Sequence, residues 1–368
     1  MPYSFSYYVH HHGAGHITRA IAIAKELLAH DDCTITFLGT GLSAYADEIP
    51  ESVNLIELPA DLPTESDRYQ RTESLSHLHY SPLNVAGLLN RNHMIVDHFQ
   101  REPHTLCIVD VSCEVAQLAR LCGIPTVVIR QHGQREDLPH QLTYESAACI
   151  IAPYAKSMSA ALEEGRYDEK TLYSGGFSRF CDVAAPTVEN ENQLALLIGK
   201  GGTSFDAKWV NELRRQLPDH FTLHILGNLD IADSYDNLVV HGHVADPLAI
   251  IQQSAIIFCN AGHNTVMEMA SLRKRMVCIP ASRPFNEQNV KAEHLERLQL
   301  ALVIREEQLF RTDWNDIIHQ ARGLDTGRWS SIMDNRALSK IANRLRQVYA
   351  SFFTTPPTTT NTITYTYA

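Results

Sequence analysis

Short apolar segments alternate with amphipathic segments along most of the chain. The apolar segments are rich in β-branched residues, as buried parallel strands tend to be. They span residues 3–10, 33–40, 53–60, 105–110, 125–130 and 148–153, and later 193–202, 221–228, 237–244, 255–262 and 276–281. Between them, residues 16–30, 112–123, 207–217 and 264–274 have helical periodicity. Strands that alternate with helices predict an α/β fold with doubly wound parallel sheets.

The predicted strands fall into two series, which indicates two α/β domains in tandem. Residues 175–192 carry Gly, Pro and polar residues without a clear period, so we place the domain boundary there. The predicted domains are residues 1–180 and 190–330, followed by an amphipathic helix at 331–353 and a Thr-rich, disordered tail at 354–368. A ligand cleft is expected where the carboxyl ends of the two sheets face each other.

Composition and charge limit the functional classes to which the protein can belong. The chain of 368 residues has a formal net charge of −11, which argues against a nucleic-acid partner. No apolar run reaches the roughly 18 residues that a transmembrane helix needs, although peripheral contact with a membrane surface stays open. The N-terminus lacks the features of a signal peptide, and the eight cysteines form no CxxC pair, so we expect a cytoplasmic protein.

The segment HHHGAGH, residues 10–16, lies between the first predicted strand and the first predicted helix. Consecutive histidines on a strand point to opposite faces, so His10 to His12 are not expected to bind one metal ion. Gly13 and Gly15 permit a tight turn and close approach of a ligand. His16 is either a capping or surface residue, or a general base that titrates near neutral pH.

A general base needs a group that orients its ring. Asp110 ends the predicted strand 105–110, at the sheet edge where His16 is also expected. Its carboxylate would hold the imidazole tautomer and stabilise the imidazolium. The alternative is that Asp110 caps the helix that begins near Ser112.

A second strand, glycine turn and helix occupies residues 258–270. The free amides of a helix beginning near His263 favour a phosphate group. Glu268 lies one turn further, where its carboxylate suits ribose hydroxyls. Downstream, we place the pair Glu287 and Gln288 in a loop before the next helix, where an acid and an amide suit sugar hydroxyls.

In these motifs the chain resembles the GT-B glycosyltransferases of family 28. The family pattern is a histidine or small residue, x, Gly, x, Asn/Thr, Ser/Thr, x, x, Glu, then Pro, an acid-Gln or Gln-Gln pair and Asn-Ala. The matching residues are Asn260, Gly262, Asn264, Thr265, Glu268, Pro280, Glu287, Gln288 and Ala292. GAGH at 13–16 is similar to the family's N-terminal glycine turn and histidine. The resemblance implies a GT-B fold, in which two Rossmann-like domains face each other across a cleft.

The resemblance also implies roles for individual residues. A nucleoside-diphosphate sugar, most often UDP-linked, would donate its sugar to an acceptor hydroxyl that His16 deprotonates, with Asp110 behind it, and the attack would invert the anomeric centre. No metal or other cofactor is expected, because a helix N-terminus takes up the diphosphate charge. The implied donor-binding residues are Gly13, Gly15, Gly201, Gly202, Val244, Asn260, Gly262, His263, Asn264, Thr265, Glu268, Glu287 and Gln288. Within this set, Glu268 would bind ribose, and Glu287 and Gln288 would face the sugar.

Three departures keep other functions open. Asn260 stands where some relatives have His, Glu287 where many have Asp, and Arg19 where a proline is often found. The segment GAGHITRA is similar to a GT-B branch that hydrolyses nucleotide sugars, in which the histidine activates water. A hydrolase and a non-catalytic nucleotide-sugar-binding subunit therefore remain alternatives. An epimerase is disfavoured because its acidic and arginine motifs are missing.

A transferase also needs a surface for its acceptor, whose identity the sequence does not indicate. Residues 61–104 and 130–137 are rich in His, Arg and Tyr and have a loop-like pattern. They either line the acceptor side or are solvated connections.

Overall fold

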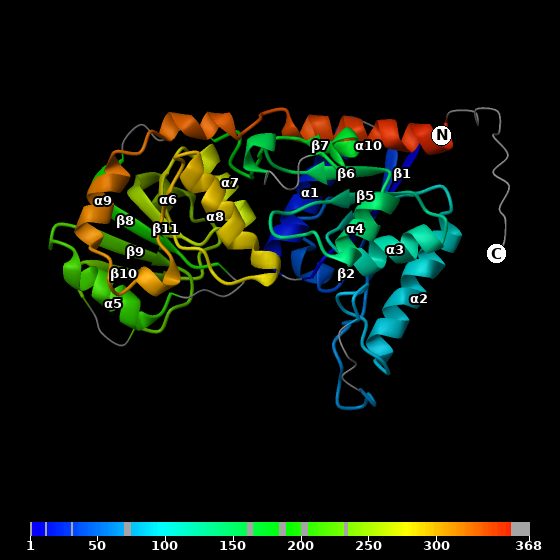
Figure 1. Cartoon of the computed structure of the whole chain (residues 1–368), viewed down its shortest axis with the longest axis horizontal. Coiled ribbons are helices and arrows are strands. Elements are labelled where there is room, and N and C mark those ends of the chain that lie inside the picture. Colours follow the sequence, from blue (N-terminus) through cyan, green and yellow to red (C-terminus); the bar gives the residue numbers. More distant parts are fainter. Residues whose placement is uncertain are drawn as a thin grey trace.

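The computed structural model describes residues 2–11, 13–30, 32–69, 75–159, 165–183, 189–199, 205–231 and 235–354. These residues form two α/β domains that lie side by side, as Figure 1 shows. Each domain contains a parallel sheet with helices packed against it, which confirms the predicted α/β organisation. The Thr-rich segment from residue 355 onward lies outside the described residues.

The described strands of the first domain form a seven-stranded parallel sheet in the order β3-β2-β1-β4-β5-β6-β7. Its strands are β1 (Tyr3–Val9), β2 (Cys33–Gly39), β3 (Val53–Glu57), β4 (Leu106–Asp110), β5 (Thr126–Ile129), β6 (Cys149–Ala152) and β7 (Thr171–Tyr173). β1 lies between β2 and β4, with Tyr7 opposite Phe37 of β2 and Ile108 of β4. The carboxyl ends of β1 and β4 are therefore neighbours at one edge of the sheet.

The described strands of the second domain form a six-stranded parallel sheet in the order β10-β9-β8-β11-β12-β13. Its strands are β8 (Asn190–Leu197), β9 (Thr222–Leu226), β10 (Leu238–Gly242), β11 (Ser254–Cys259), β12 (Arg275–Cys278) and β13 (Leu302–Val303). β11 is fully buried between β8 and β12, so its apolar run Ala255–Phe258 fits a central strand. Its carboxyl end leads directly into the second glycine turn.

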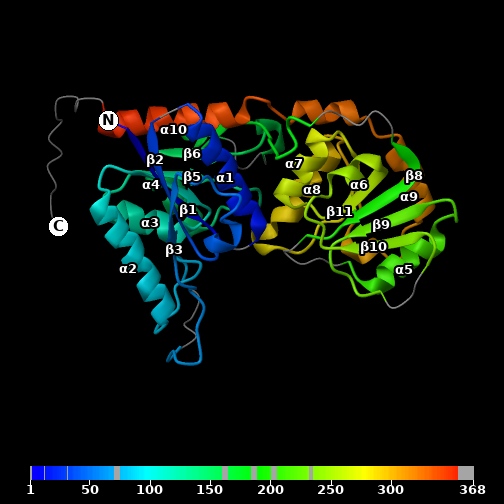
Figure 2. The ribbon, with the colours of Figure 1, turned by 180° about the vertical axis from the view of Figure 1, so that it is seen from behind.

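Helices cover both faces of each sheet, as the view from behind in Figure 2 also shows. The described α-helices are α1 (Ala14–Leu28), α2 (Ala86–Arg101), α3 (Cys113–Leu121), α4 (Leu138–Ser146), α5 (Ala207–Gln216), α6 (Leu248–Gln253), α7 (His263–Ser271), α8 (Glu287–Arg297), α9 (Trp314–Arg322) and α10 (Ala337–Phe353). No helix among the described residues is both long and apolar enough to span a membrane.

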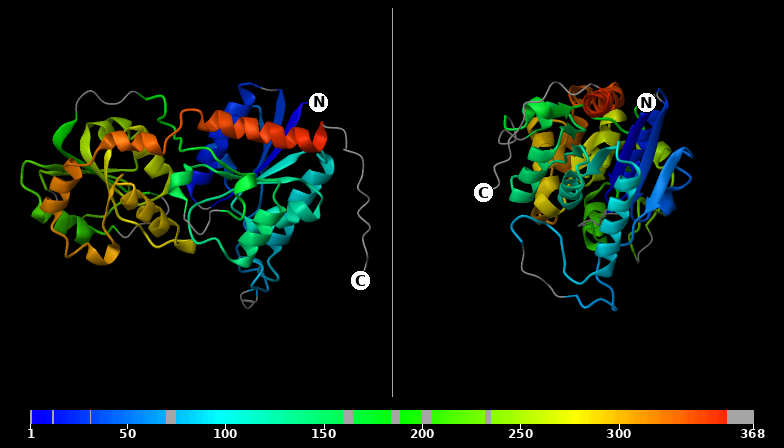
Figure 3. Two further views of the ribbon diagram at one scale, coloured as in Figure 1. Left: turned by 45° about the horizontal axis from the view of Figure 1, so that its top comes forward. Right: turned by 90° about the vertical axis from the view of Figure 1, so that its right-hand side faces the viewer.

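The C-terminal helix α10 packs on the N-terminal domain, beside α1 (Figure 3). The ring of Tyr349 contacts those of Tyr3 and Phe5, with centroids 5.3 and 5.8 Å apart. The chain thus crosses between the domains twice, and the crossings touch where Gly176 N–H donates to the carbonyl of Ile332 at 2.8 Å. Helix α10, which follows the second domain in the sequence, therefore packs on the first domain.

Three expectations about secondary structure were wrong, and two short strands were not predicted. The segment 61–104, expected to be loop-like, contains α2, whose sequence is polar enough to hide its periodicity. Glu287 and Gln288 form the first turn of α8 rather than a loop before it. The last helix begins at Ala337 rather than residue 331, because a 3-10 helix at Thr326–Ser331 precedes it. β7 and β13, of three and two residues, had no sequence signal.

Candidate active site

The N-terminal glycine turn brings His16 to the carboxyl edge of the first sheet. β1 ends at Val9, and α1 begins at Ala14 with Gly13 as its N-cap residue. Gly13 has φ +83°, a left-handed conformation that favours glycine. His16 therefore lies in the first turn of α1, where it is buried, and the interpretation of His16 as an exposed surface residue does not fit.

His16 lies against Asp110 at the end of β4. The His16 Nδ1 is 3.1 Å from Asp110 Oδ2, and the Asp110 side chain is fully buried. Arg19, one turn further along α1, donates to both oxygens of Asp110 at 2.7 and 2.8 Å. Burial alone would raise the pKa of Asp110, but Arg19 and His16 outweigh it and hold this pKa far below its usual value. Asp110 is therefore an anion at any physiological pH.

This arrangement sets the tautomer of His16. A carboxylate only accepts hydrogen bonds, so the proton between His16 and Asp110 resides on Nδ1 of His16. The Nη2 of Arg19, which only donates, is also near Nδ1, at 3.2 Å, but its shorter bonds go to Asp110. Nε2 of His16 then carries the lone pair that a general base needs.

The alternative role of Asp110 as a helix cap is not what the structure shows. Ser112 is the N-cap residue of α3, and its hydroxyl accepts from Val115 N–H at 3.3 Å. Between Asp110 and Ser112, Val111 has φ +60°, a strained conformation for a β-branched residue. The strain lies directly beside Asp110, where it helps to turn the chain after β4.

The second glycine turn faces the first one across the domain boundary. α7 begins at His263 after Gly262, and no acidic residue occupies its first turn, so its amides suit an anion. The Nδ2 of Asn264 lies 3.5 Å from the carbonyl oxygen of Gly15. The starts of α1 and α7, each predicted to bind ligand, are thus brought together.

The turn before α7 is held by the side chain of its own Asn260 and by that of Gln288 from α8. Asn260 donates from Nδ2 to the carbonyl of Ile279 at 2.7 Å. The Oε1 of Gln288 accepts from the N–H groups of Ala261 and Ala281 at 3.1 and 2.9 Å. The side-chain oxygen of Gln288 therefore stabilises this turn. Only the side-chain NH2 group of Gln288 remains to bind a ligand.

A buried lysine lies beneath this turn and was missed by the sequence reasoning. Lys291, at the position before Ala292, donates to the carbonyl of Ala261 at 3.2 Å and to Glu287 Oε1 at 3.3 Å. Burial alone would raise the pKa of Glu287, but Lys291 and Arg135 outweigh it and lower this pKa. Glu287 is therefore ionised near neutral pH. The sequence gave no indication that Lys291, a lysine within a helix, is buried.

Glu268 occupies its expected place on α7 and already has a cationic partner. Arg179, from the connection between the domains, donates from Nε to Glu268 Oε1 at 2.8 Å. Burial raises the pKa of Glu268, and Arg179 only partly offsets this effect. A ribose at Glu268 would share the carboxylate with Arg179 or displace it, since the Arg179 side chain is 46% exposed.

The segment 130–137 is a domain contact rather than a solvated connection. Gln134 N–H donates to the carbonyl of Phe285 at 2.7 Å, and Arg135 lies over the Phe285 ring at 5.0 Å. His132 is 2% exposed and stacks on Tyr154, with ring centroids 3.9 Å apart. Phe285 and Asn286 both have positive φ, and this tight turn presents Glu287 to the first domain.

The structure gives less information about the remaining predicted residues. Val244 is half-buried in the loop between β10 and α6. Gly201, Gly202 and His12 lie outside the described residues. A cavity of about 190 Å³ opens at the edge of the first sheet, and its lining includes His10, His11, Ile17, Thr40, Leu42 and Tyr45. His16 does not line this cavity, but its ring centroid is 5.2 Å from that of His10.

Comparison with known proteins gives the family of the second domain. Residues 221–319 match the model of the glycosyltransferase family 28 C-terminal domain. Solved structures resemble the whole chain. CalG4, the calicheamicin glycosyltransferase, superposes with a TM-score of 0.64 at 15% identity over 96% of this chain and 100% of that one.

This chain has the GT-B fold, and its second domain matches the family 28 C-terminal domain. The expected fold is thereby confirmed, and MurG of Acinetobacter baumannii supports it with a TM-score of 0.63 at 15% identity, covering 94% of this chain and 100% of MurG. The GT-B protein is also 33% identical over 122 residues to UDP-N-acetylglucosamine--N-acetylmuramyl-(pentapeptide) pyrophosphoryl-undecaprenol N-acetylglucosamine transferase 3 of Bacillus thuringiensis (strain Al Hakam). That alignment covers 29% of this chain and only about a third, 34%, of the curated relative.

Proposed function

We propose that this GT-B protein is an inverting glycosyltransferase that moves a sugar from a UDP-linked donor to an acceptor hydroxyl. The observation that carries the proposal is the pairing of His16 with Asp110 at the start of α1, facing the start of α7. The proposed base, His16, and the N-terminus of α7, which is suited to an anion, thus lie together at the domain boundary. The family 28 match of the second domain and the UDP-sugar in the relative's name support the donor class.

The proposed reaction needs one proton transfer and one displacement. The acceptor oxygen attacks the anomeric carbon and its proton passes to Nε2 of His16. The bond between that carbon and the diphosphate breaks, and UDP leaves with the electron pair. Asp110 stabilises the imidazolium that forms.

The leaving diphosphate is assigned to the start of α7. The amides of His263, Asn264 and Thr265 and the helix dipole would take up its developing charge, so the proposed reaction is metal-independent. Lys291, buried beneath the same turn, adds a positive charge nearby. Glu287 and Gln288 are proposed to face the sugar, and Glu268 the ribose.

The cavity beside His16 is proposed as the acceptor site. Its volume of about 190 Å³ has room for a group of roughly one ring, next to the proposed base. Its lining mixes imidazole and phenol rings with aliphatic side chains and the Thr40 hydroxyl. Space for an acceptor favours transfer to a hydroxyl over hydrolysis, in which water alone must reach His16.

A donor panel tests the proposal. The purified protein is incubated with UDP-, dTDP- and GDP-sugars, and nucleoside diphosphate release is measured with and without a pool of acceptors from a cell extract. Release from a UDP-sugar that depends on the extract is the expected result. Equally fast release in buffer alone would make the protein a hydrolase, and tight binding without release would make it a binding subunit. Either result would overturn the proposal.

A further inference from the structure

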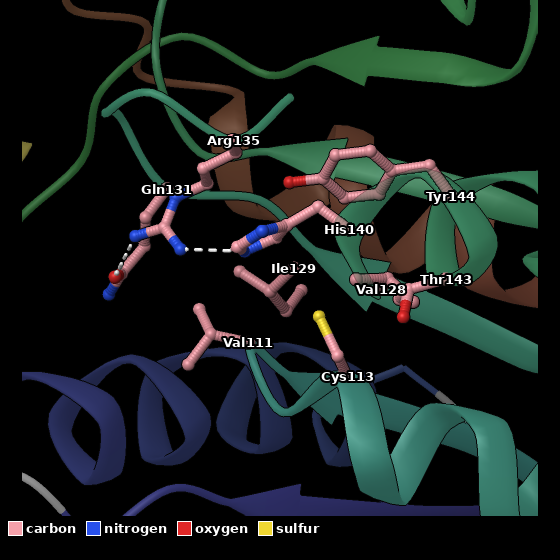
Figure 4. Close-up of a pocket in the computed structure, with 9 residues that line it drawn as sticks. All are labelled: Val111, Cys113, Val128, Ile129, Gln131, Arg135, His140, Thr143 and Tyr144. Carbon is pink, nitrogen blue, oxygen red and sulfur yellow. Dashed lines mark hydrogen bonds between the residues drawn. The ribbon is translucent and has the colours of Figure 1, made fainter. Parts of the chain in front are cut away.

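A cluster of metal-ligand side chains lies next to the 130–137 segment and includes no residue of the proposed reaction site. One ring nitrogen each of His79 and His140 and the Sγ of Cys113 all lie within 4.8 Å of one another. His79 precedes α2, Cys113 is the first residue of α3, and His140 lies in α4. Figure 4 shows Cys113 and His140 lining one small pocket, with the thiol directed into it.

Asp137 holds both histidines. Its Oδ1 is 3.0 Å from Nε2 of His79, and both its oxygens are 2.9 Å from Nδ1 of His140. Metal-binding histidines typically donate one ring N–H to a carboxylate in this way, which orients the ring and fixes its tautomer. The other nitrogen of each ring, Nδ1 of His79 and Nε2 of His140, does not bond to Asp137.

Arg135 occupies Nε2 of His140, so a cation that binds at this nitrogen has to displace it. Its Nη1 is 3.0 Å from Nε2 of His140 (Figure 4), and a guanidinium only donates, so this nitrogen presents a lone pair. Arg135 has other partners that it keeps when it leaves His140, namely the His132 carbonyl at 3.0 Å and Gln131 at 3.3 Å. Its carboxylate neighbour Glu287 is 4.0 Å away.

We propose that Cys113, His140 and His79 form a binding site for a divalent transition metal, with Zn²⁺ as the ion that this ligand set favours. Sulfur and imidazole ligands suit Zn²⁺, and water would complete the tetrahedron. Tetrahedral Zn²⁺ with these bond lengths separates its ligand atoms by about 3.3–3.8 Å, so side-chain shifts of about 1 Å close the site. Binding releases the thiol proton of Cys113 to solvent.

The surroundings fit a structural metal site rather than a catalytic one. Cys113 and His140 are buried, whereas the His79 side chain is 26% exposed and leaves a path for the ion. Phe285 of the second domain contacts the rings of His79 and His140, with centroids 4.9 and 4.8 Å apart. The metal would therefore fix the loop before α2 against α3 and α4, beside the domain boundary.

Metal titration of the full chain tests this site independently of any transferase activity. Protein stripped with a chelator is titrated with Zn²⁺ in competition with a chromophoric chelator, and with Co²⁺ to record its spectrum. We expect one equivalent of metal and a thiolate-to-Co²⁺ charge-transfer band. Cys113→Ser should abolish the band, and His79→Ala should weaken Zn²⁺ binding by more than about tenfold.

Matched variants control for unspecific effects. Cys122→Ser removes an exposed thiol from the end of α3, and His77→Ala removes an exposed imidazole from the same loop as His79. Both should bind metal as the unmodified chain does. Absence of stoichiometric binding, or a charge-transfer band that survives Cys113→Ser, would overturn the proposal. Since His79 is partly exposed, His79→Ala also gives an answer if the buried Cys113 variant does not fold.

Discussion

His16 and Asp110 lie side by side, with the imidazole Nδ1 3.1 Å from the carboxylate Oδ2, although they are 94 positions apart in the chain. The parallel pairing of β1 with β4 brings them together, because Asp110 ends β4 and His16 follows the turn after β1. Arg19 joins the pair through the same carboxylate. Asp110 therefore serves two partners, one proposed for chemistry and one for stability.

Asp110→Asn should lower both the stability of the protein and its rate of sugar transfer. An amide leaves the buried Arg19 charge without its counter-ion, and breaking such a buried pair costs about 3–5 kcal/mol. The free energy of unfolding, measured by urea denaturation, should fall by about this amount. A variant as stable as the unmodified chain would contradict the described ion pair.

Replacing both members of the ion pair separates the two roles of Asp110. The double variant Arg19→Met with Asp110→Leu removes the charges together, and such apolar replacements of buried pairs are often neutral for stability. We expect it to recover most of the stability that Asp110→Asn loses. Sugar transfer should remain impaired, because His16 still lacks its orienting carboxylate. Recovery of transfer along with stability would show that Asp110 acts only in folding.

The β1-turn-α1 and β11-turn-α7 units were predictable from the sequence because each depends on local signals. Apolar runs, glycines and helical periodicity all occur within a few residues of one another there. Arg19 carried no such signal, since it resembles an ordinary polar residue of α1, and only the packing of β4 beside β1 gives it a partner. Lys291 and His132 were missed for the same reason: their burial depends on the opposite domain or on a distant loop.

Helix α10 shows a different limit of sequence reasoning. Its amphipathic pattern predicted a helix, but not the domain on which its apolar face would pack. That choice depends on contacts such as Tyr349 with Tyr3, which join the two ends of the chain. The short strands β7 and β13 exist only because longer strands offer them an edge.

Glu268→Ala should weaken donor binding. The proposed ribose contact is a hydrogen bond to a charged group, worth about 1.5–3 kcal/mol, so the donor Kd should rise about ten- to a hundredfold. Isothermal titration with UDP measures this effect directly. Glu293→Ala, which removes an exposed carboxylate from α8, is the matched control. Equal affinities of the two variants would refute the ribose assignment.

The buried His132 should make stability fall in mild acid. Burial, then Lys291, His263, His294 and Arg135, lower the pKa of His132 well below its usual value. Protonation therefore favours the unfolded chain: stability is full above pH about 6.5 and declines as the pH falls below it. The decline from this one group is at most about 1.4 kcal/mol per pH unit.

His132→Phe tests that decline while keeping a ring against Tyr154. Neither ring nitrogen of His132 has a hydrogen-bond partner among the described residues, so phenylalanine loses no bond. The unfolding free energy of this variant, measured between pH 7.5 and 5, should depend less steeply on pH. His319→Phe, at an exposed position of α9, should keep the original slope. Parallel slopes for all three chains would contradict a neutral, buried His132.

The most direct test of the proposed mechanism compares turnover and donor binding in His16→Ala. A general base contributes roughly a hundred- to ten-thousandfold, so kcat for sugar transfer should fall by about that factor. The Kd for UDP should stay unchanged, because the nucleotide is assigned to the opposite domain. His30→Ala, at an exposed position just after α1, serves as the control. Unchanged kcat, or loss of UDP binding with normal turnover at saturating donor, would contradict the assignment of His16 as the base.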